Sequence, residues 1–320
     1  MNERQERILD LVTEQYIGSA RPVPSAWVAR KLRVSSATVR NEFSLLEEQG
    51  YLQQPHTSAG RVPTGLTYLR YARKFIPPQQ LPEAERRFLI ERLRGLHGDN
   101  LFQRIANVAA DLSGYAVVVN LPPDDSLLTL QVHLSAISSS RLLAVVVLES
   151  GLIRQLVLEV EPVPPEQALR EAESDLGQLT LPVREVPVAL LDIAKRASEE
   201  VARTFFALAQ AWHGLNPPRV FSQGLTNLLS EPESTDPNFV RHVVERLERP
   251  QPQHDEDEAV AVILEDLLAQ VRTRLPLGAC RGGLILLGPT RMRYPEVLMV
   301  VRGVTETVAG RAQPEEADLN

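Results

Sequence analysis

The chain has 320 residues, 43% of them hydrophobic, which suffices for two or three domains with separate cores, and its formal net charge of −7 argues against indiscriminate coating of nucleic acid. The single cysteine, Cys280, excludes an internal disulfide. No apolar run approaches the roughly 20 residues of a membrane span and no secretory leader is evident, so we expect a cytoplasmic protein that spans no membrane.

Three helices are predicted within the first 50 residues. The first carries an apolar stripe of helical period, and the second is a short helix that Ser25 can cap. The third begins after an N-cap at Ser35 or Ser36 and ends at Gly50, which suits a left-handed C-cap. The inward-facing residues are Ile8, Leu11, Val12 and Tyr16 in the first helix, Trp27, Val28 and Leu32 in the second, and Val39, Phe43 and Leu46 in the third.

The third helix directs polar side chains away from its apolar stripe. Small residues in a first turn let a helix enter the major groove of DNA, and Arg and Asn match base edges or phosphate oxygens. The outward-facing residues are Ser35, Ser36, Ala37, Thr38, Arg40, Asn41 and Ser44. The pattern is typical of a recognition helix whose Ser36, Thr38, Arg40 and Asn41 approach bases or nearby phosphates.

A small, basic turn follows this helix. Tyr51 and Leu52 begin a strand, and a short tip lies between Pro55 and Pro63. We interpret it as a wing whose backbone N–H groups and arginine lie on phosphates or reach the minor groove. The tip residues expected to hold DNA are His56, Thr57, Ser58, Gly60 and Arg61. The order of elements predicts a winged helix-turn-helix, although periodicity alone equally allows a three-helix domain that binds proteins.

The distribution of charge favours DNA as the partner. Residues 1–75 hold eleven Lys or Arg against seven Asp or Glu, whereas the rest of the chain holds 23 against 34. An acidic body repels a polyanion, so only the N-terminal module is left as a docking face, with salt-sensitive binding.

Prolines at 77, 78 and 82 stiffen a linker over 77–82, which separates an N-terminal domain, residues 1–76, from the remainder. Beyond it we expect helices over 83–96 and from Asn100, which can form a capping box with Gln103, to Gly114. Strand-like runs follow at 115–120, 127–137, 142–149 and 152–160. Helices on both sides of an antiparallel sheet indicate an α+β fold.

A long helix is predicted within residues 161–223. Its apolar stripe, with Phe206 beside it, is formed by Val201, Phe205, Leu208 and Trp212. Most stripes of this kind are a domain's own core. A helix-turn-helix protein also gains affinity and register by pairing two copies, so the alternative is a subunit interface.

The last third of the chain contains further helix and strand signals. Helical periodicity is expected over 260–271, a strand over 283–287, and a final helix from Tyr294 to about Val308. Arg291 and Arg293 precede that helix and are assigned to a surface or to an inter-domain contact. Residues 250–258, PQPQHDEDE, are interpreted as a solvated acidic loop.

No pattern of catalytic or metal-binding residues is present in the sequence. The six histidines have no metal-ligand spacing, and no nucleophile elbow, P-loop or dinucleotide fingerprint occurs. We therefore expect neither an enzyme nor a resident metal or cofactor.

Several motifs resemble the heat-inducible transcription repressor HrcA family. In the N-terminal domain they are SSATVRNE, LEEQGYL, QQPHTSAGRVPT and YLRYARKF, and later ones are GLTNLL at 224–229 and LGPTRM at 287–292, followed by Tyr294. The resemblance spans nearly the whole chain and is strongest at 34–64. Pro24 departs from the family's usual glycine, and the segment over 269–283 is shortened.

The resemblance implies a winged helix domain over 1–76 and a GAF-like domain over 83–160 and 224–312, interrupted by an inserted dimerisation domain over 161–223. It further implies a homodimer that binds an inverted-repeat operator in double-stranded DNA upstream of chaperone genes, with an active fold maintained by chaperonin. Chaperonin occupied by misfolded clients would then leave operators free on heating. The alternative is a metabolite-sensing regulator with an effector in the GAF-like domain.

Overall fold

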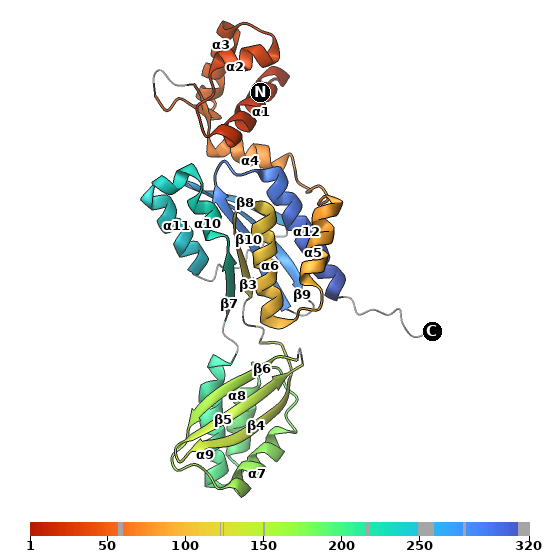
Figure 1. Ribbon diagram of the computed structural model, residues 1–320. Coiled ribbons are helices and arrows are strands. Elements are labelled where there is room, and N and C mark those ends of the chain that lie inside the picture. Colours follow the sequence, from red (N-terminus) through yellow and green to blue (C-terminus); the bar gives the residue numbers. More distant parts are fainter. Residues whose placement is uncertain are drawn as a thin grey trace, which may run out of the picture. The chain divides into compact units, whose positions relative to one another are not determined.

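The computed structural model describes residues 1–56, 60–121, 123, 125–149, 151–215, 218–248, 259–277 and 280–312. The chain divides into two compact units (Figure 1). Unit 1 comprises Met1–Asn120, Val220–Gly278 and Gly282–Asn320, and unit 2 comprises Leu121–Arg219 with Ala279–Arg281. The fold is α+β in both units, as expected.

Residues 1–76, which we call the head, belong to unit 1. They form α1 (Glu3–Ser19), α2 (Ser25–Leu32), α3 (Ser36–Glu48), the hairpin strands β1 (Leu52–Gln53) and β2 (Val62–Pro63), and α4 (Gly65–Arg73). The apolar stripes of the three helices and the hairpin share one core, as the sequence predicts. Its fully buried members include Ile8, Val12, Val28, Val39 and Leu46.

The ends of α1 and α3 are fixed by side-chain caps. The Asn2 side chain accepts the backbone N–H of Gln5 in a capping box, and Ser35 Oγ accepts the backbone N–H of Thr38 at 3.0 Å. Gly50 has φ +78° just after α3, a left-handed conformation that suits glycine. Ser25 does not cap α2, because it is the first residue of that helix and its hydroxyl contacts Ser36 instead.

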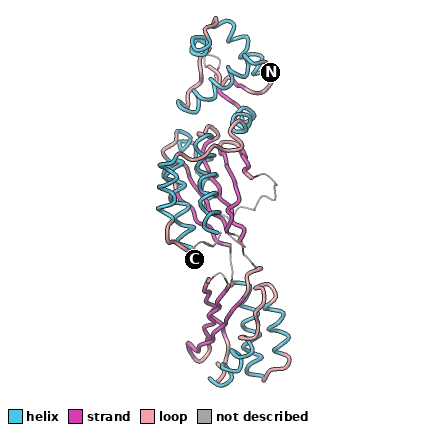
Figure 2. The backbone as a smooth tube through the Cα atoms, turned by 90° about the vertical axis from the view of Figure 1, so that its right-hand side faces the viewer, coloured by secondary structure: helices cyan, strands magenta, loops and turns pink. Residues whose placement is uncertain are grey.

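The remainder of unit 1 is a five-stranded sheet in the order β7-β3-β10-β9-β8, with helices packed against it (Figure 2). The strands are β3 (Ala116–Leu121), β7 (Arg219–Gln223), β8 (Val260–Glu265), β9 (Leu268–Leu277) and β10 (Cys280–Pro289). The helices are α5 (Glu83–Leu93), α6 (Gly98–Ser113), α10 (Leu225–Leu229), α11 (Pro237–Glu248) and α12 (Tyr294–Ala312), with a 3-10 turn η2 (Pro232–Thr235). α12 packs on β9 and beside α6 and α5, and β3 is buried along its whole length.

Two local expectations in this part are wrong. Residues 260–271 form the antiparallel hairpin β8–β9 instead of a helix, with a turn at Asp266, where φ is +47°. The β-branched residues Val260, Val262 and Ile263 favour a strand, whereas the spacing of Val260, Ile263 and Leu264 also fits a helix. Asn100 does not begin a helix, since α6 starts two residues earlier behind His97.

Unit 2 is a three-stranded antiparallel sheet with helices packed against it. The strands β4 (Thr129–Ser138), β5 (Arg141–Leu148) and β6 (Ile153–Glu159) lie in that order. The helices are α7 (Glu166–Leu176), α8 (Val186–Ala194) and α9 (Glu199–Ala211), followed by the 3-10 turn η1 (Trp212–Gly214). Along β5, buried residues alternate with half-buried ones, so one face of the sheet joins the core with the helices.

Two domain boundaries in the structure differ from those expected from the sequence. The strands at 129–159 pack on α7 and α9, so they belong to unit 2, which begins at Leu121 instead of near residue 161. The segment at 77–82 does not separate the head from the rest of unit 1. Leu81 is buried against α12, where a Cβ on Gly303 would come within 2.8 Å of it, and Arg302 donates to the Pro78 carbonyl at 2.6 Å.

Among the described residues, no helix is both long and apolar enough to cross a membrane.

Candidate nucleic-acid interface

The two sides of α3 have opposite character. Val39, Phe43 and Leu46 are at most 3% exposed, whereas Arg40 and Asn41 are exposed on the opposite side. Ser35 and Ser44 are also exposed, and Ser36 and Thr38 are half-buried. Of the six residues predicted here to face DNA, four are thus exposed and two are half-buried.

Local hydrogen bonds engage most of the hydroxyls on this surface. Ser35 Oγ lies 2.7 Å from Thr38 Oγ1, Ser36 Oγ lies 3.0 Å from Ser25 Oγ, and Ser44 Oγ donates to the Arg40 carbonyl at 3.1 Å. Within the part of the chain that the structure describes, Arg40 and Asn41 have no hydrogen bond or ion pair from their side chains. Among the described residues, these two exposed side chains are therefore free to bind a ligand.

The hairpin is tied to the rest of the head at its base. Arg61 exchanges backbone hydrogen bonds with Val23, at 2.9 and 3.0 Å. A Cβ on Gly60 would meet the Val23 carbonyl oxygen at 2.2 Å, so only glycine fits there. His56 is exposed, and the predicted Thr57 and Ser58 lie outside the described residues.

The Arg61 side chain is not directed to solvent. Its guanidinium pairs with Glu47 of α3 at 2.8 Å, and only 15% of the side chain is exposed. The second oxygen of Glu47 accepts the backbone N–H of Gln54 at 3.1 Å. Arg61 thus joins the hairpin to α3, and the DNA contact expected of it from the sequence stays a prediction.

Glu47 and Glu42 are residues that sequence reasoning missed. Glu42, on α3, accepts from Gln5 Nε2 at 3.0 Å, which ties the helix to α1. The sequence shows acidic residues beside an otherwise basic surface, but their partners lie 14 and 37 positions away. Only the folded head brings these pairs together.

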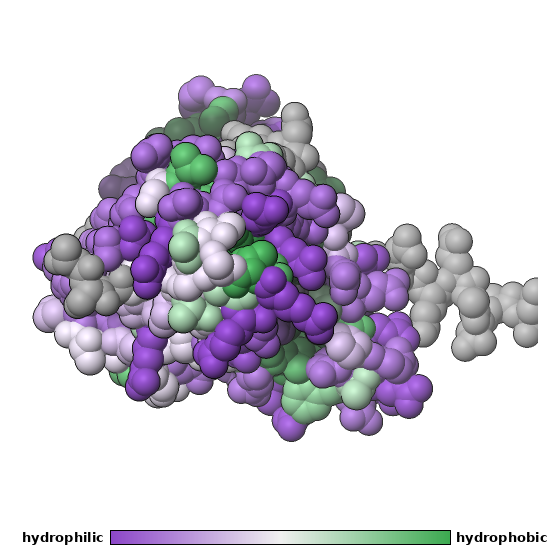
Figure 3. Space-filling model, turned by 90° about the horizontal axis from the view of Figure 1, so that it is seen from above, coloured by the Kyte–Doolittle hydropathy of each residue, from purple (hydrophilic) through white to green (hydrophobic). Residues whose placement is uncertain are grey.

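Further cations surround α3. Arg30, Lys31 and Arg33 are exposed in and just after α2, which packs on α3, and the Lys31 ammonium lies 5.5 Å from the Trp27 ring centroid. Hydrophilic side chains predominate on the face that Figure 3 shows. Exposed cations beside a polar helix surface can attract a polyanion over a long range.

Comparison with known proteins places the chain in a family. Residues 99–298 match the family description "HrcA protein C terminal domain". The chain belongs to the HrcA family. One relative, the "Heat-inducible transcription repressor HrcA" of Chloroflexus aggregans, is 31% identical over 94% of this chain and 90% of its own length. Another of the same name, from Brevibacillus brevis, is 28% identical over 96% of both chains.

A solved structure has the same fold as this HrcA-family chain. It is described as "Crystal structure of a hypothetical protein at 2.2 A resolution" and aligns with a TM-score of 0.63 and 21% identity. The alignment covers 97% of this chain and 99% of the other, so the likeness extends over the whole architecture.

The apolar stripe of α9 is core in this HrcA-family chain. Val201, Phe205 and Leu208 are 0% exposed and Trp212 is 3% exposed, all within the hydrophobic core of unit 2. The indole N–H of Trp212 donates to the Val183 carbonyl at 3.0 Å. The subunit interface expected at these four residues is therefore wrong, because the sheet and helices of unit 2 already cover them. Phe206, beside them, is 52% exposed.

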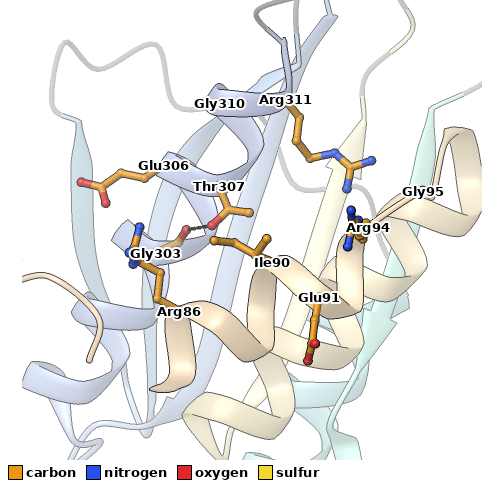
Figure 4. Close-up of a pocket in the computed structure, with 10 residues that line it drawn as sticks. All are labelled: Arg86, Ile90, Glu91, Arg94, Gly95, Gly303, Glu306, Thr307, Gly310 and Arg311. Atoms are coloured by element: carbon orange, nitrogen blue, oxygen red, sulfur yellow. Dashed lines mark hydrogen bonds between the residues drawn. The ribbon is translucent and has the colours of Figure 1, made fainter. Parts of the chain in front are cut away.

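A groove of about 600 Å³ lies between α5 and α12 (Figure 4). Ile90 and Thr307 face each other across it. Arg86 is paired with Glu83 at 2.7 Å, and Arg311 donates to the Leu96 carbonyl at 2.7 Å. The other lining residues are Glu91, Arg94, Gly95, Gly303, Glu306 and Gly310. No cluster of His, Cys, Asp and Glu suited to a metal ion occurs within the described residues.

Proposed function

We propose that this chain is a DNA-binding transcriptional repressor of heat-shock chaperone operons that occupies an inverted-repeat operator as a dimer. The observation that carries the proposal is the pair Arg40 and Asn41, exposed and free on a helix whose opposite side is buried. The relatives named as heat-inducible transcription repressors support it.

In this proposal the head is a winged helix and α3 enters the major groove. Arg40 and Asn41 read base edges, because their forked groups match purines. The hydroxyls of Ser35, Ser36, Thr38 and Ser44 approach the backbone phosphates or nearby bases, and His56, Thr57, Ser58 and Gly60 bring the hairpin to the duplex. Arg61 acts through Glu47, as the link that sets the angle between hairpin and helix.

In the same proposal the sheet layer of unit 1 is GAF-like and unit 2 is the inserted dimerisation domain. The open face of the β4-β5-β6 sheet suits a second copy. Ile153 and Val157 are 59% and 56% exposed, and the register places them directly across from Val147 and Leu143. A two-fold axis would set one such apolar face on its counterpart and remove both from water.

Heat would act through folding. A domain's net stability is a small difference between large terms, so a few kcal/mol lost on warming unfolds a substantial fraction of the chains, and a dimer loses occupancy further as its monomers fail. Chaperonin that refolds the chain would restore operator occupancy. Equal operator binding by heated protein with and without chaperonin would remove this part of the proposal.

Genome-wide footprinting with and without a heat pulse tests the proposed function directly. Footprints upstream of chaperone and chaperonin operons that fade on heating are expected. Footprints scattered without regard to those operons, or unchanged by heat, would contradict it.

The α5–α12 groove favours one alternative, a metabolite-sensing regulator. Its volume fits a small molecule, and the Arg94 guanidinium, exposed at the groove, has no protein partner among the described residues. A thermal-shift screen of small phosphates and carboxylates tests it. A compound that both stabilises the chain and alters DNA affinity would support sensing. A ligand changes DNA affinity only if it binds the conformations of high and low DNA affinity differently.

A further inference from the structure

Arg291 lies in the turn between β10 and α12, and its side chain is only 8% exposed. The guanidinium donates to Glu233 through Nε at 2.7 Å and through Nη2 at 2.9 Å, and to Glu231 through Nη2 at 2.6 Å. Glu233 lies in η2 of unit 1, and Glu231 immediately precedes that turn. Its three hydrogen bonds to these carboxylates are charge-assisted, so the largely buried guanidinium is held in one orientation.

The third nitrogen of the same guanidinium reaches the head. Arg291 Nη1 donates to the Ile17 carbonyl at 3.1 Å, across 274 positions of sequence. Ile17 is in the last turn of α1, where carbonyls lack a helical partner and carry partial negative charge. Arg291 therefore connects two carboxylates of the sheet layer to a helix end of the head.

The electrostatic surroundings keep this connection charged. Burial alone lowers the pKa of Arg291, but the hydrogen bonds and charges of Glu233 and Glu231 outweigh it and raise the pKa. On the head side, burial raises the pKa of the Tyr16 hydroxyl, and the charge of Glu233 raises it further. Head and sheet layer thus share one electrostatic cluster around Arg291.

Apolar contacts surround the cluster. Tyr68 of α4 and Tyr294 of α12 are 3% and 0% exposed, with ring centroids 6.4 Å apart. Arg302 holds the Pro78 carbonyl, and Leu81 is packed at Gly303. The head is therefore attached through α1, which accepts a hydrogen bond from Arg291, through α4 and through the linker.

We propose that Arg291 is a positioning residue for DNA binding: its clamp on Ile17, Glu231 and Glu233 fixes the angle at which the head presents α3, and so the spacing of half-sites that a dimer accepts. The inference rests on the proposed function. A rigidly attached second head has a high effective concentration at its half-site for one half-site spacing. A loosely attached head has a lower effective concentration, distributed over many spacings.

The test compares affinities for inverted repeats whose spacers are lengthened or shortened by single base pairs. The variant R291Q/E233Q removes the guanidinium together with one carboxylate, so the net charge of the cluster is unchanged, although Glu231 loses its cationic partner. We expect its affinity for the preferred spacer to fall about tenfold, its spacer profile to flatten, and its affinity for a single half-site to stay unchanged. R291K keeps the positive charge but loses the forked guanidinium, so its spacer profile should lie between those of the unaltered chain and R291Q/E233Q. It is also the variant least prone to misfold.

Arg293→Gln is the matched control. Arg293 is two residues away, and its guanidinium lies near the Ser113 carbonyl and the Tyr115 ring, both in the sheet layer. Its spacer profile should equal that of the unaltered chain. If R291K and R291Q/E233Q keep the same preference as the unaltered chain, this inference is overturned and the proposed function stands. If the unaltered chain binds no repeat at any spacing, both are overturned.

Discussion

Glu47 on α3 and Arg61 on the hairpin form an ion pair of 2.8 Å, with the arginine largely buried and the glutamate half exposed. A guanidinium held by a carboxylate in this way is occupied before any DNA arrives. Arg61 is thus a cation that stabilises the fold of the head, whereas Arg40 is a cation that is free to bind a ligand.

Arg40→Ala is expected to weaken operator binding by about 1 to 3 kcal/mol and to relax the preference for one base pair, because a bidentate base contact is lost. Asn41→Ala should relax a different position. Gel-shift titrations against single-base operator variants measure both effects. Unchanged affinity together with unchanged base preference would remove Arg40 from the interface.

Arg61→Ala is expected to behave differently. Since its guanidinium is engaged by Glu47, loss of Arg61 should leave the dependence of affinity on salt concentration unchanged, whereas each lost phosphate contact lowers that slope by about 1. Arg61→Ala and Glu47→Gln break the same ion pair, so the two variants should reduce discrimination between operator and random DNA to a similar extent. A lower salt slope for Arg61→Ala would show instead that Arg61 leaves Glu47 to contact phosphate.

The head was largely predictable because its signals are local. Caps such as Ser35 and Gly50, and apolar residues at helical spacing, specify α3 without reference to the rest of the chain. Partners distant in sequence could not be predicted in this way. Arg291 is 274 positions from Ile17 and 58 from Glu233, so its sequence neighbours carry no trace of the clamp.

Ambiguity of period explains the other differences. Val260, Ile263, Leu264 and Val271 fit a helical stripe as well as they fit two strands, and the turn at Asp266 decided for the hairpin. The α9 stripe was recognised from sequence, but whether it faces its own sheet or a second subunit depends on where the three strands before it pack.

Alkaline pH is expected to unfold unit 1 through its tyrosines. Burial raises the pKa of Tyr68, and burial with the nearby Tyr115 raises that of Tyr294, above the ordinary 10.0. Burial and the charges of Glu14, Asp10 and Glu296 raise the pKa of Tyr71 to about 12. A folded-state pKa above the unfolded value gives stability that is complete below pH 10 and is lost as pH rises past 10.

Tyrosinate absorbance and circular dichroism, followed together in an alkaline titration, measure this loss. Tyr68→Phe should move the unfolding midpoint to higher pH, because the phenyl ring has no proton to lose. Tyr294→Phe should do the same but cost about 1 kcal/mol at neutral pH, since the Tyr294 hydroxyl donates to the Thr290 carbonyl at 2.7 Å. Ionisation of Tyr68 or Tyr294 well before any loss of helix, assigned by comparison with the two Phe variants, would contradict this expectation.

Val157→Glu is expected to shift the chain from dimer to monomer without unfolding it. Val157 is 56% exposed on the open face of the unit 2 sheet, so a carboxylate there is solvated in the monomer but buried and unpaired in a dimer formed through that face. Phe206→Ser is the matched control, because Phe206 is equally exposed but lies on α9, whose buried residues line the core on the helical side of the sheet. Sedimentation at several concentrations reads the oligomeric state, and operator affinity should fall with it for Val157→Glu. If Phe206→Ser alone yields monomers, the dimer forms through the helical side of unit 2 and the assignment to the sheet face is wrong.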